Sequence, residues 1–205
     1  MFDSYIFDMD GTLWDAVDSY CAVWNRTFEE CGVNVAAVTR PQLEALMGTP
    51  LDGICRALAG DTALPAGFME RLHANEVGMM PSLGGRLYPD VRSTLEALKA
   101  RGARLFMVSN CDAGGIPNFL RFTGLEGLIE DFRTFGDNGC EKDVNIAAIV
   151  ERYNLSAPVY VGDTAGDAAA THKAGLPFAW AAYGFGRDVT DYEIKLDKFS
   201  DLNRL

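Results

Sequence analysis

Residues 5–13 read Tyr5-Ile6-Phe7-Asp8-Met9-Asp10-Gly11-Thr12-Leu13, a short apolar run that ends abruptly in acids and a glycine. A run of this length that stops at turn-forming residues predicts a buried strand entering a loop. Three more strands are predicted downstream, at 103–108, 159–161 and 178–182. Segments with helical spacing precede them, at 90–101, 145–153 and 167–174. Strands that alternate with helices predict an α/β fold, in which helices cover both faces of a Rossmann-like parallel sheet.

The chain between the first strand and Pro81 has a different character, because it shows no strand pattern and many helix signals. Helices are predicted over Trp14–Cys31, after the N-cap and proline of Thr49-Pro50, and over Phe68–Val77. We therefore expect a core of residues 1–14 and 83–205 and a small α-helical cap of residues 15–82. Loops around Asp15 and Met80–Gly85 are the expected hinges. The alternative is that these helices pack with the sheet in a single domain.

Composition excludes several classes of protein. The 205 residues hold 18 basic and 29 acidic side chains, a net charge of −11 that disfavours binding of nucleic acid or anionic membrane. No apolar run approaches the roughly 20 residues of a membrane span. The N-terminus carries no positive leader, and the five scattered cysteines and two histidines do not suit a zinc site. We expect a cytoplasmic protein with reduced thiols.

Polar residues gather where the predicted strands end. Ligands of parallel α/β sheets bind beyond the carboxyl ends of the strands, and the residues at those ends are Asp8, Asp10, Ser109, Asn110, Asp163 and Asp167, with Lys142 opening a helix. Carboxylates that converge without His or Cys suit a hard cation, and Mg²⁺ is the usual one. A lysine and a hydroxyl beside that ion would hold a phosphoryl group. The sequence thus predicts a magnesium site that accepts phosphate.

These motifs resemble those of the haloacid dehalogenase-like (HAD) hydrolases. The resemblance rests on Asp8-Met9-Asp10-Gly11-Thr12-Leu13, Ser109-Asn110, Lys142 and Gly162-Asp163-Thr164-Ala165-Gly166-Asp167, in the family's order and spacing. The helical segment after the first motif is similar to the family's small cap. Residues 86–91 look like the stretch before the second motif of phosphoglycolate phosphatase-like members. One departure is Asp143, because many relatives have proline directly after the lysine.

The resemblance implies a mechanism and a set of roles. Asp8 would attack phosphorus and form an aspartyl-phosphate, while Asp10 would serve as general acid and base. Ser109, Asn110 and Lys142 would bind the phosphoryl group. Mg²⁺ would be held by Asp8, the main-chain carbonyl of Asp10, Asp163 and Asp167, the last directly or through water.

The implied activity is Mg²⁺-dependent hydrolysis of a small phosphorylated metabolite. Two alternatives stay open: a phosphomutase of the β-phosphoglucomutase type, although such mutases usually carry valine where this chain has Thr12, and a catalytically silent phosphate-binding module. Arg133 and Lys173 compete with Lys142 for the third motif. Trp14 could stack on a substrate or simply pack. Cap arginines that could contact an anionic substrate are Arg26, Arg40, Arg56 and Arg71. The protein could be a monomer or a homodimer.

Overall fold

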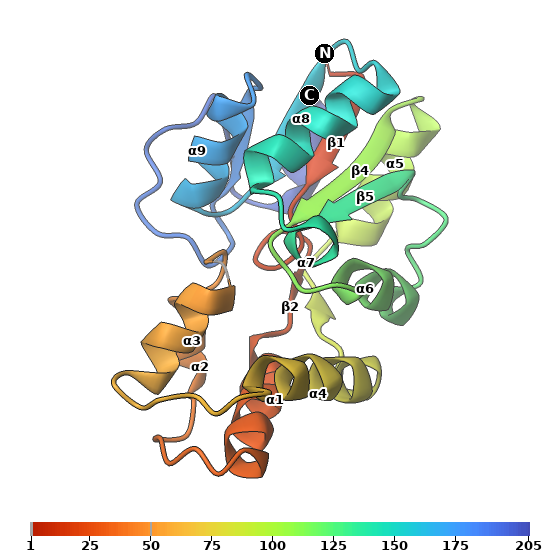
Figure 1. The fold of residues 1–205 in the computed structure, drawn as a ribbon. Coiled ribbons are helices and arrows are strands. Elements are labelled where there is room, and N and C mark those ends of the chain that lie inside the picture. Colours follow the sequence, from red (N-terminus) through yellow and green to blue (C-terminus); the bar gives the residue numbers. More distant parts are fainter. Residues whose placement is uncertain (1, 50) are drawn as a thin grey trace.

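Six strands form one sheet in which every recorded pairing is parallel, and helices cover both of its faces (Figure 1). The computed structural model describes residues 2–49 and 51–205. The strand order is β5 (Asp131–Thr134), β4 (Arg104–Ser109), β1 (Ser4–Phe7), β6 (Pro158–Gly162), β7 (Phe178–Ala181) and β8 (Ile194–Leu196). The predicted α/β fold is therefore confirmed, with the first predicted strand at the centre of the sheet.

Alternating side chains of the central strands build two hydrophobic layers. Tyr5 and Phe7 of β1 face one side, where they join the apolar side chains of α5 (Val91–Ala100) and the 3-10 helix η1 (Phe199–Arg204). Ile6 faces the other side, where α8 (Lys142–Tyr153) and α9 (Ala165–Lys173) cover the sheet. Because successive strand residues point to opposite faces, a continuous apolar run is what a strand buried on both sides requires.

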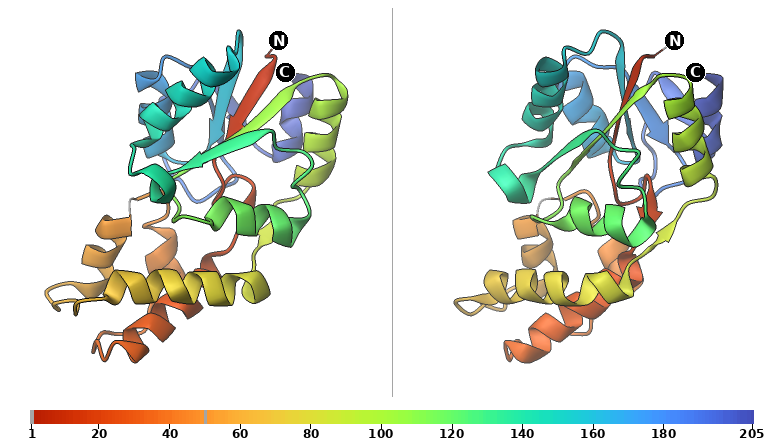
Figure 2. Two further views of the ribbon diagram at one scale, coloured as in Figure 1. Left: turned by 45° about the vertical axis from the view of Figure 1, so that its right-hand side comes forward. Right: turned by 90° about the vertical axis from the view of Figure 1, so that its right-hand side faces the viewer.

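The helices between β2 (Trp14–Asp15) and β3 (Arg86–Leu87) all lie off the carboxyl edge of the sheet (Figures 1 and 2). We call residues 16–85 the insert. Its helices are α1 (Val17–Glu30), α2 (Arg40–Glu44), α3 (Leu51–Ala59) and α4 (Phe68–Leu83). Aromatic rings of α1 and α4 pack together, with Phe28 and Phe68 centroids 5.2 Å apart. These rings belong to the same hydrophobic cluster as Tyr5 and Phe7 of the sheet, and the insert faces the polar strand ends.

The junction of the insert differs from the predicted loops. Trp14–Asp15 and Arg86–Leu87 pair as a two-stranded antiparallel ribbon, and α4 continues past Pro81 to Leu83. The expected hinge at Met80–Gly85 is thus largely helical, and the helix predicted from Trp14 begins at Val17. Two-residue strands carry no periodicity that a sequence could reveal. The predicted proline start of α3 falls on Pro50, which lies outside the described residues.

Two edge strands and two short helices beyond the insert were not predicted. Residues of β5 are mostly half-buried, and those of β8 alternate between buried and exposed positions, so neither segment has a continuous apolar run. Helix α6 (Gly115–Thr123) and the short α7 (Phe135–Asn138) follow β4 and β5. Among the described residues, no helix is both long and apolar enough to cross a membrane.

Candidate active site

Three neighbouring strands end at the same polar edge. Asp8 directly follows β1, Ser109 is the last residue of β4, and Asp163 directly follows β6. Strands β4 and β6 flank β1 on either side, so their carboxyl ends converge. The buried central strands therefore place three polar side chains, each less than 5% exposed, where the insert faces the sheet.

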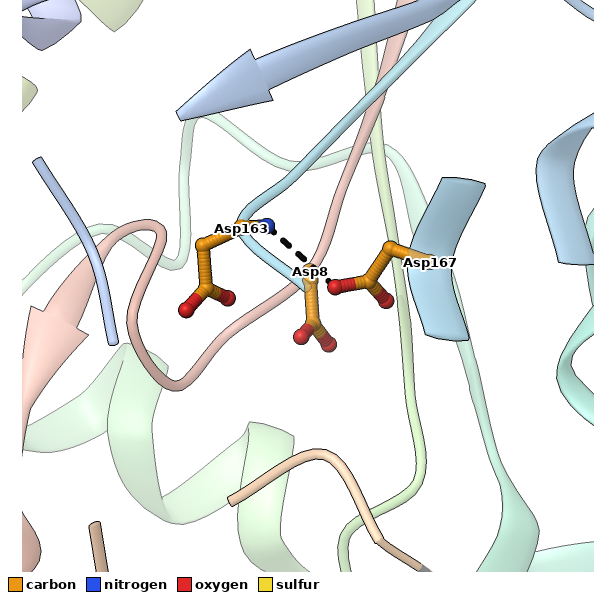
Figure 3. Close-up of side chains that lie close together, drawn as sticks. All are labelled: Asp8, Asp163 and Asp167. Carbon is orange, nitrogen blue, oxygen red and sulfur yellow. Dashed lines mark hydrogen bonds between the residues drawn. The ribbon is translucent and has the colours of Figure 1, made fainter. Parts of the chain in front are cut away.

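Asp8, Asp163 and Asp167 form a buried carboxylate cluster (Figure 3). One oxygen from each lies within 4.8 Å of the others. Burial and the nearby charge of Asp167 raise the pKa of Asp163 to about 8. Burial raises the pKa of Asp8 to about 6, with Lys142 opposing the shift. Carboxylates arranged so closely repel one another unless a cation lies between them, and an all-oxygen donor set suits a hard cation such as Mg²⁺.

Asp163 is oriented by two segments of the chain. Its Oδ2 accepts hydrogen bonds from the main-chain N–H groups of Phe185 at 2.8 Å and Gly186 at 3.2 Å. Thr12 lies on its other side, with Oγ1 at 3.4 Å from Oδ1. Gly11 has φ +79°, and a Cβ built there would lie 2.3 Å from the Asp163 carboxylate. Only glycine fits this turn, because it combines the left-handed backbone with the close approach.

Lys142 is the buried cation of the site. Its Nζ lies 2.5 Å from Oδ1 of Asp167 and 3.2 Å from Oδ1 of Asp8. The contact to Asp8 does not have hydrogen-bond geometry, so that Asp8 oxygen is buried without a hydrogen-bond partner. Burial alone would lower the pKa of Lys142, but the two carboxylates raise it well above its usual value. The ammonium therefore stays protonated, and it lies beside a free carboxylate oxygen.

The acids that keep Lys142 charged are Asp8 and Asp167, and neither is adjacent to it in the chain. Glu141 is exposed, and Asp143 pairs with Lys173 at 2.9 Å. That ion pair also places Lys173, one of the competing cations, on the exposed surface of α9. The other competitor, Arg133, lies on β5, and its Nε is buried without a hydrogen-bond partner. Of the three cations considered, Lys142 is the one that contacts Asp8.

Asp167 serves its helix and the site at once. Its Oδ2 accepts hydrogen bonds from the main-chain N–H and the hydroxyl of Thr164, which is a capping box at the start of α9. Its Oδ1 accepts from Lys142. Burial would raise the pKa of Asp167, but Lys142 and Thr164 hold it below its usual value. Both oxygens of Asp167 are thus already engaged within the protein.

Asp10 lies apart from the carboxylate cluster. Its Oδ1 accepts a hydrogen bond of 2.9 Å from the indole Nε1 of Trp14. Burial and the charge of Asp8 raise its pKa well above the usual value, which favours the protonated form of this carboxyl. Trp14 is 1% exposed and packs edge-on against Phe119 at 4.9 Å, which places its ring in the interior and its N–H on Asp10. Trp14 therefore orients Asp10, a role that the sequence did not suggest.

Ser109 and Asn110 follow β4 on the other side of β1. Ser109 is 4% exposed, and its Oγ accepts a long hydrogen bond of 3.4 Å from the main-chain N–H of Cys111. The side chain of Asn110 donates to the carbonyl of Gly48 in the insert, at 3.2 Å. Both residues line a cavity with Asp8, Asp10 and Lys142. The structure thus gathers five of the predicted residues around one cavity and the other two, Asp163 and Asp167, beside Asp8.

The four cap arginines do not line this cavity. Arg26 pairs with Glu29 and Glu30, Arg40 with Asp15, Asp18 and Glu44, Arg56 with Asp52, and Arg71 with Glu30. The side of the cavity formed by the insert is instead largely apolar, and it carries one acid, Glu76 of α4. Sequence spacing contained a signal for Glu76, because it lies four residues from both Leu72 and Met80 on the buried stripe of α4.

Comparison with known proteins finds relatives along most of the chain. A family model described as haloacid dehalogenase-like hydrolase matches residues 5–181. A phosphoglycolate phosphatase of Aliivibrio fischeri is 30% identical over 203 residues, covering 90% of this chain and 87% of the relative. A phosphoglycolate phosphatase of Rhodospirillum rubrum is 29% identical, with 89% of this chain and 80% of the relative covered.

Solved structures share the fold. A predicted phosphoglycolate phosphatase from Haemophilus somnus superposes with a TM-score of 0.86 at 22% identity, over 99% of this chain and 97% of that one. CbbY from Rhodobacter sphaeroides, solved in complex with phosphate, superposes with a TM-score of 0.85 at 20% identity, over 98% and 96% of the two chains. At these identities the likeness concerns the fold alone.

Proposed function

We propose, since the chain belongs to the haloacid dehalogenase-like hydrolase family and is a phosphatase, that it hydrolyses a small phosphate monoester through an aspartyl-phosphate on Asp8. One observation carries the proposal: Asp8 is a buried carboxylate that lines the cavity and has an oxygen without a hydrogen-bond partner. A nucleophile needs such a free lone pair, and Lys142 at 3.2 Å marks where an anionic group would be attracted.

In the first step, an Asp8 oxygen forms a bond to phosphorus as the bond to the leaving oxygen breaks. Asp10 gives its proton to that oxygen, so the alcohol leaves neutral. In the second step, Asp10 takes a proton from water, which attacks phosphorus and releases Asp8 and inorganic phosphate. The raised pKa of Asp10 supports this assignment, because a general acid must hold its proton at the working pH.

Three further residues would bind the phosphoryl oxygens. Lys142 supplies a protonated ammonium, Ser109 a hydroxyl and Asn110 an amide, and all three line the cavity beside Asp8. The ammonium would neutralise charge that builds on the phosphoryl group during transfer. The Asn110 amide has two N–H donors, and the carbonyl of Gly48 engages one of them, so the other could bind phosphate.

Mg²⁺ is the proposed cofactor, and the donor set fits it. Asp8 and Asp163 would hold the ion together with the main-chain carbonyl of Asp10, while Asp167 would act through water, because both of its oxygens are already hydrogen-bonded. When bound, the ion would neutralise the carboxylates and polarise the phosphoryl group. The five free cysteines support the inference that the protein works in the reducing cytoplasm.

The test is release of inorganic phosphate from small phosphate esters, with Mg²⁺ or with EDTA. Release should require Mg²⁺ and should fall by roughly a thousandfold or more in Asp8→Asn. Asp3→Asn is the matched control, since Asp3 lies at the opposite end of β1 and its amide would still accept hydrogen bonds. Sugar phosphates recovered as isomers would instead identify a mutase. Full activity of Asp8→Asn would refute the proposal.

A further inference from the structure

The cavity over Asp8 has two walls of different chemistry. The wall formed by the sheet edge carries Asp8, Asp10, Ser109 and Lys142, which the proposed reaction assigns to the phosphoryl group. The opposite wall belongs to the insert and faces the rest of the substrate. A monoester held on the first wall therefore presents its alcohol to the second, so the residues of the insert determine which alcohol fits.

The wall formed by the insert is mostly hydrocarbon and an indole ring, and it also carries the hydroxyls of Tyr20 and Thr49 and the acid Glu76. Trp24 comes from α1, Leu43 from α2, Met47 from the turn after it, and Leu51 and Ile54 from α3. Cavities that bind small molecules are commonly lined in this way, with a few polar groups that fix orientation. The apolar part of such a surface gains free energy by covering the apolar part of an alcohol, and the described residues of this wall offer no positive charge to an anion.

The charged groups of the cavity point to the same selection. Among the described residues that line it, Lys142 is the only cation, and it already contacts Asp8 and Asp167. Apart from Asp8, Asp10 and Lys142, the charged groups that line the cavity are Glu76 and Asp112, and both are acids. Nδ1 of His73 lies 2.5 Å from Oδ2 of Asp112, so this histidine already has an acidic partner.

Burial and Asp112 raise the pKa of Glu76 to about 7, with His73 opposing the shift. A second anion in the substrate would therefore meet hydrocarbon, two hydroxyls and acids but no free cation, and burying a carboxylate without a counter-charge is unfavourable.

From these two features we infer that the phosphatase selects monoesters whose alcohol is uncharged and presents hydrocarbon to the insert, and disfavours phosphoglycolate. The inference rests on the proposed function, because it takes the phosphoryl group to lie at Asp8. The substrate preference inferred for this chain therefore differs from the substrate in the names of its phosphoglycolate phosphatase relatives. The space within the cavity is about 700 Å³, a figure that includes open solvent at its mouth.

The test compares two substrates of the same shape, phosphoglycolate and its carboxamide analogue, with propyl phosphate as a purely apolar ester. We expect kcat/KM for the amide and for propyl phosphate to exceed that for phosphoglycolate by about tenfold or more. Glu76→Gln removes a group that is ionised above pH 7 without changing its shape, so at pH 8 it should raise kcat/KM for phosphoglycolate several-fold relative to the amide. Equal or higher kcat/KM for phosphoglycolate in the unmodified protein would overturn the inference.

A second pair of variants tests the wall itself. Ile54→Arg places a cation in the cavity, and it should shift the preference toward phosphoglycolate by about tenfold. Ala57→Arg, three residues on along α3 and exposed, should leave the preference unchanged. An unchanged preference in Ile54→Arg would contradict the assigned wall. Failure of the proposed function looks different: no ester would release phosphate in Mg²⁺, or release would persist in Asp8→Asn.

Discussion

At the scale of single residues, the site depends on two side chains that hold the reacting carboxyls in place. Lys142 lies between Asp8 and Asp167 and is 5% exposed. Trp14 donates its indole N–H to Asp10 from a fully buried ring. A residue of similar size cannot replace either side chain. Each packs in the interior and also places one polar atom on a carboxylate of the site.

Lys142→Met should destabilise the protein as well as inactivate it. The substitution leaves Asp8 and Asp167 buried without their cation, and breaking a buried ion pair in this way costs about 3 kcal/mol or more. Urea unfolding in EDTA measures the loss without a contribution from metal. Lys173→Met is the matched control, because its ammonium is paired but exposed, so its loss should stay below about 1 kcal/mol. Equal losses in the two variants would contradict this role of Lys142.

Trp14→Phe should lower kcat by roughly tenfold with little change in KM, because the ring still packs against Phe119 while Asp10 loses its donor. Steady-state kinetics measure the effect. A double-mutant cycle with Asp10→Asn provides the control: if Trp14 acts through Asp10, removing the indole N–H has no further effect once that carboxyl is gone. Additive losses in the cycle would assign Trp14 a packing role only.

At the scale of elements, the site is an assembly of loops that follow parallel strands. The turn after β7 lies against the turn after β1 at Gly184. A Cβ at Gly184 would lie 2.3 Å from the carbonyl oxygen of Gly11 and 2.4 Å from Cβ of Asp163. Neither atom can move without displacing the site. The distance between the turns at Gly184 and Gly11 therefore sets the position of Asp163.

Gly184→Ala should therefore weaken Mg²⁺ binding more than it weakens the fold. Displacement of Asp163 removes one of the proposed ligands from its position, so the Mg²⁺ concentration for half-maximal activity should rise by about tenfold. Activity measured across an Mg²⁺ series gives this value. Gly127→Ala serves as the control, since nothing lies within 4 Å of its added Cβ. An unchanged Mg²⁺ requirement in Gly184→Ala would rule out this function of the close approach.

At the scale of the whole molecule, charged side chains join α9 to the segment that leads into β8, the edge strand nearest the C-terminus. His172 of α9 lies 3.1 Å from Asp191 and 3.2 Å from Glu193, just before β8. Hydrogen bonding to Glu193 raises the pKa of His172 above its usual value. A raised histidine pKa adds stability that is fully present below the unfolded pKa, near 6.5, and is lost as pH rises through the folded pKa.

His172→Gln should consequently destabilise the protein at pH 6 and have little effect at pH 8.5. The pair is partly exposed, so the difference at pH 6 should stay near or below about 1 kcal/mol. Chemical unfolding of both proteins at the two pH values measures it, and comparison of the variant with its parent cancels the titration of other groups. A loss that is equal at both pH values would show that His172 contributes packing rather than charge.

Much of the site could be predicted because local sequence decides where a strand ends. An apolar run followed by Asp8 or by Gly162-Asp163 stops where turn-forming residues begin, and parallel strands bring all such ends to one edge. The sheet, its covering helices and the order of the polar groups therefore followed from the sequence by itself. The edge strands β5 and β8 did not, because a strand that is only half buried lacks a continuous apolar run.

Only the tertiary structure decided which charges meet. The partners of Lys142 are distant Asp8 and Asp167 rather than adjacent acids, and each cap arginine is paired away from the cavity. The same holds for Trp14 on Asp10 and for Glu76 in the cavity wall. These contacts depend on how helices and loops are rotated when they pack, and many join residues far apart in the chain. Sequence spacing sets the face of a helix, but packing of the insert against the sheet sets what that face meets.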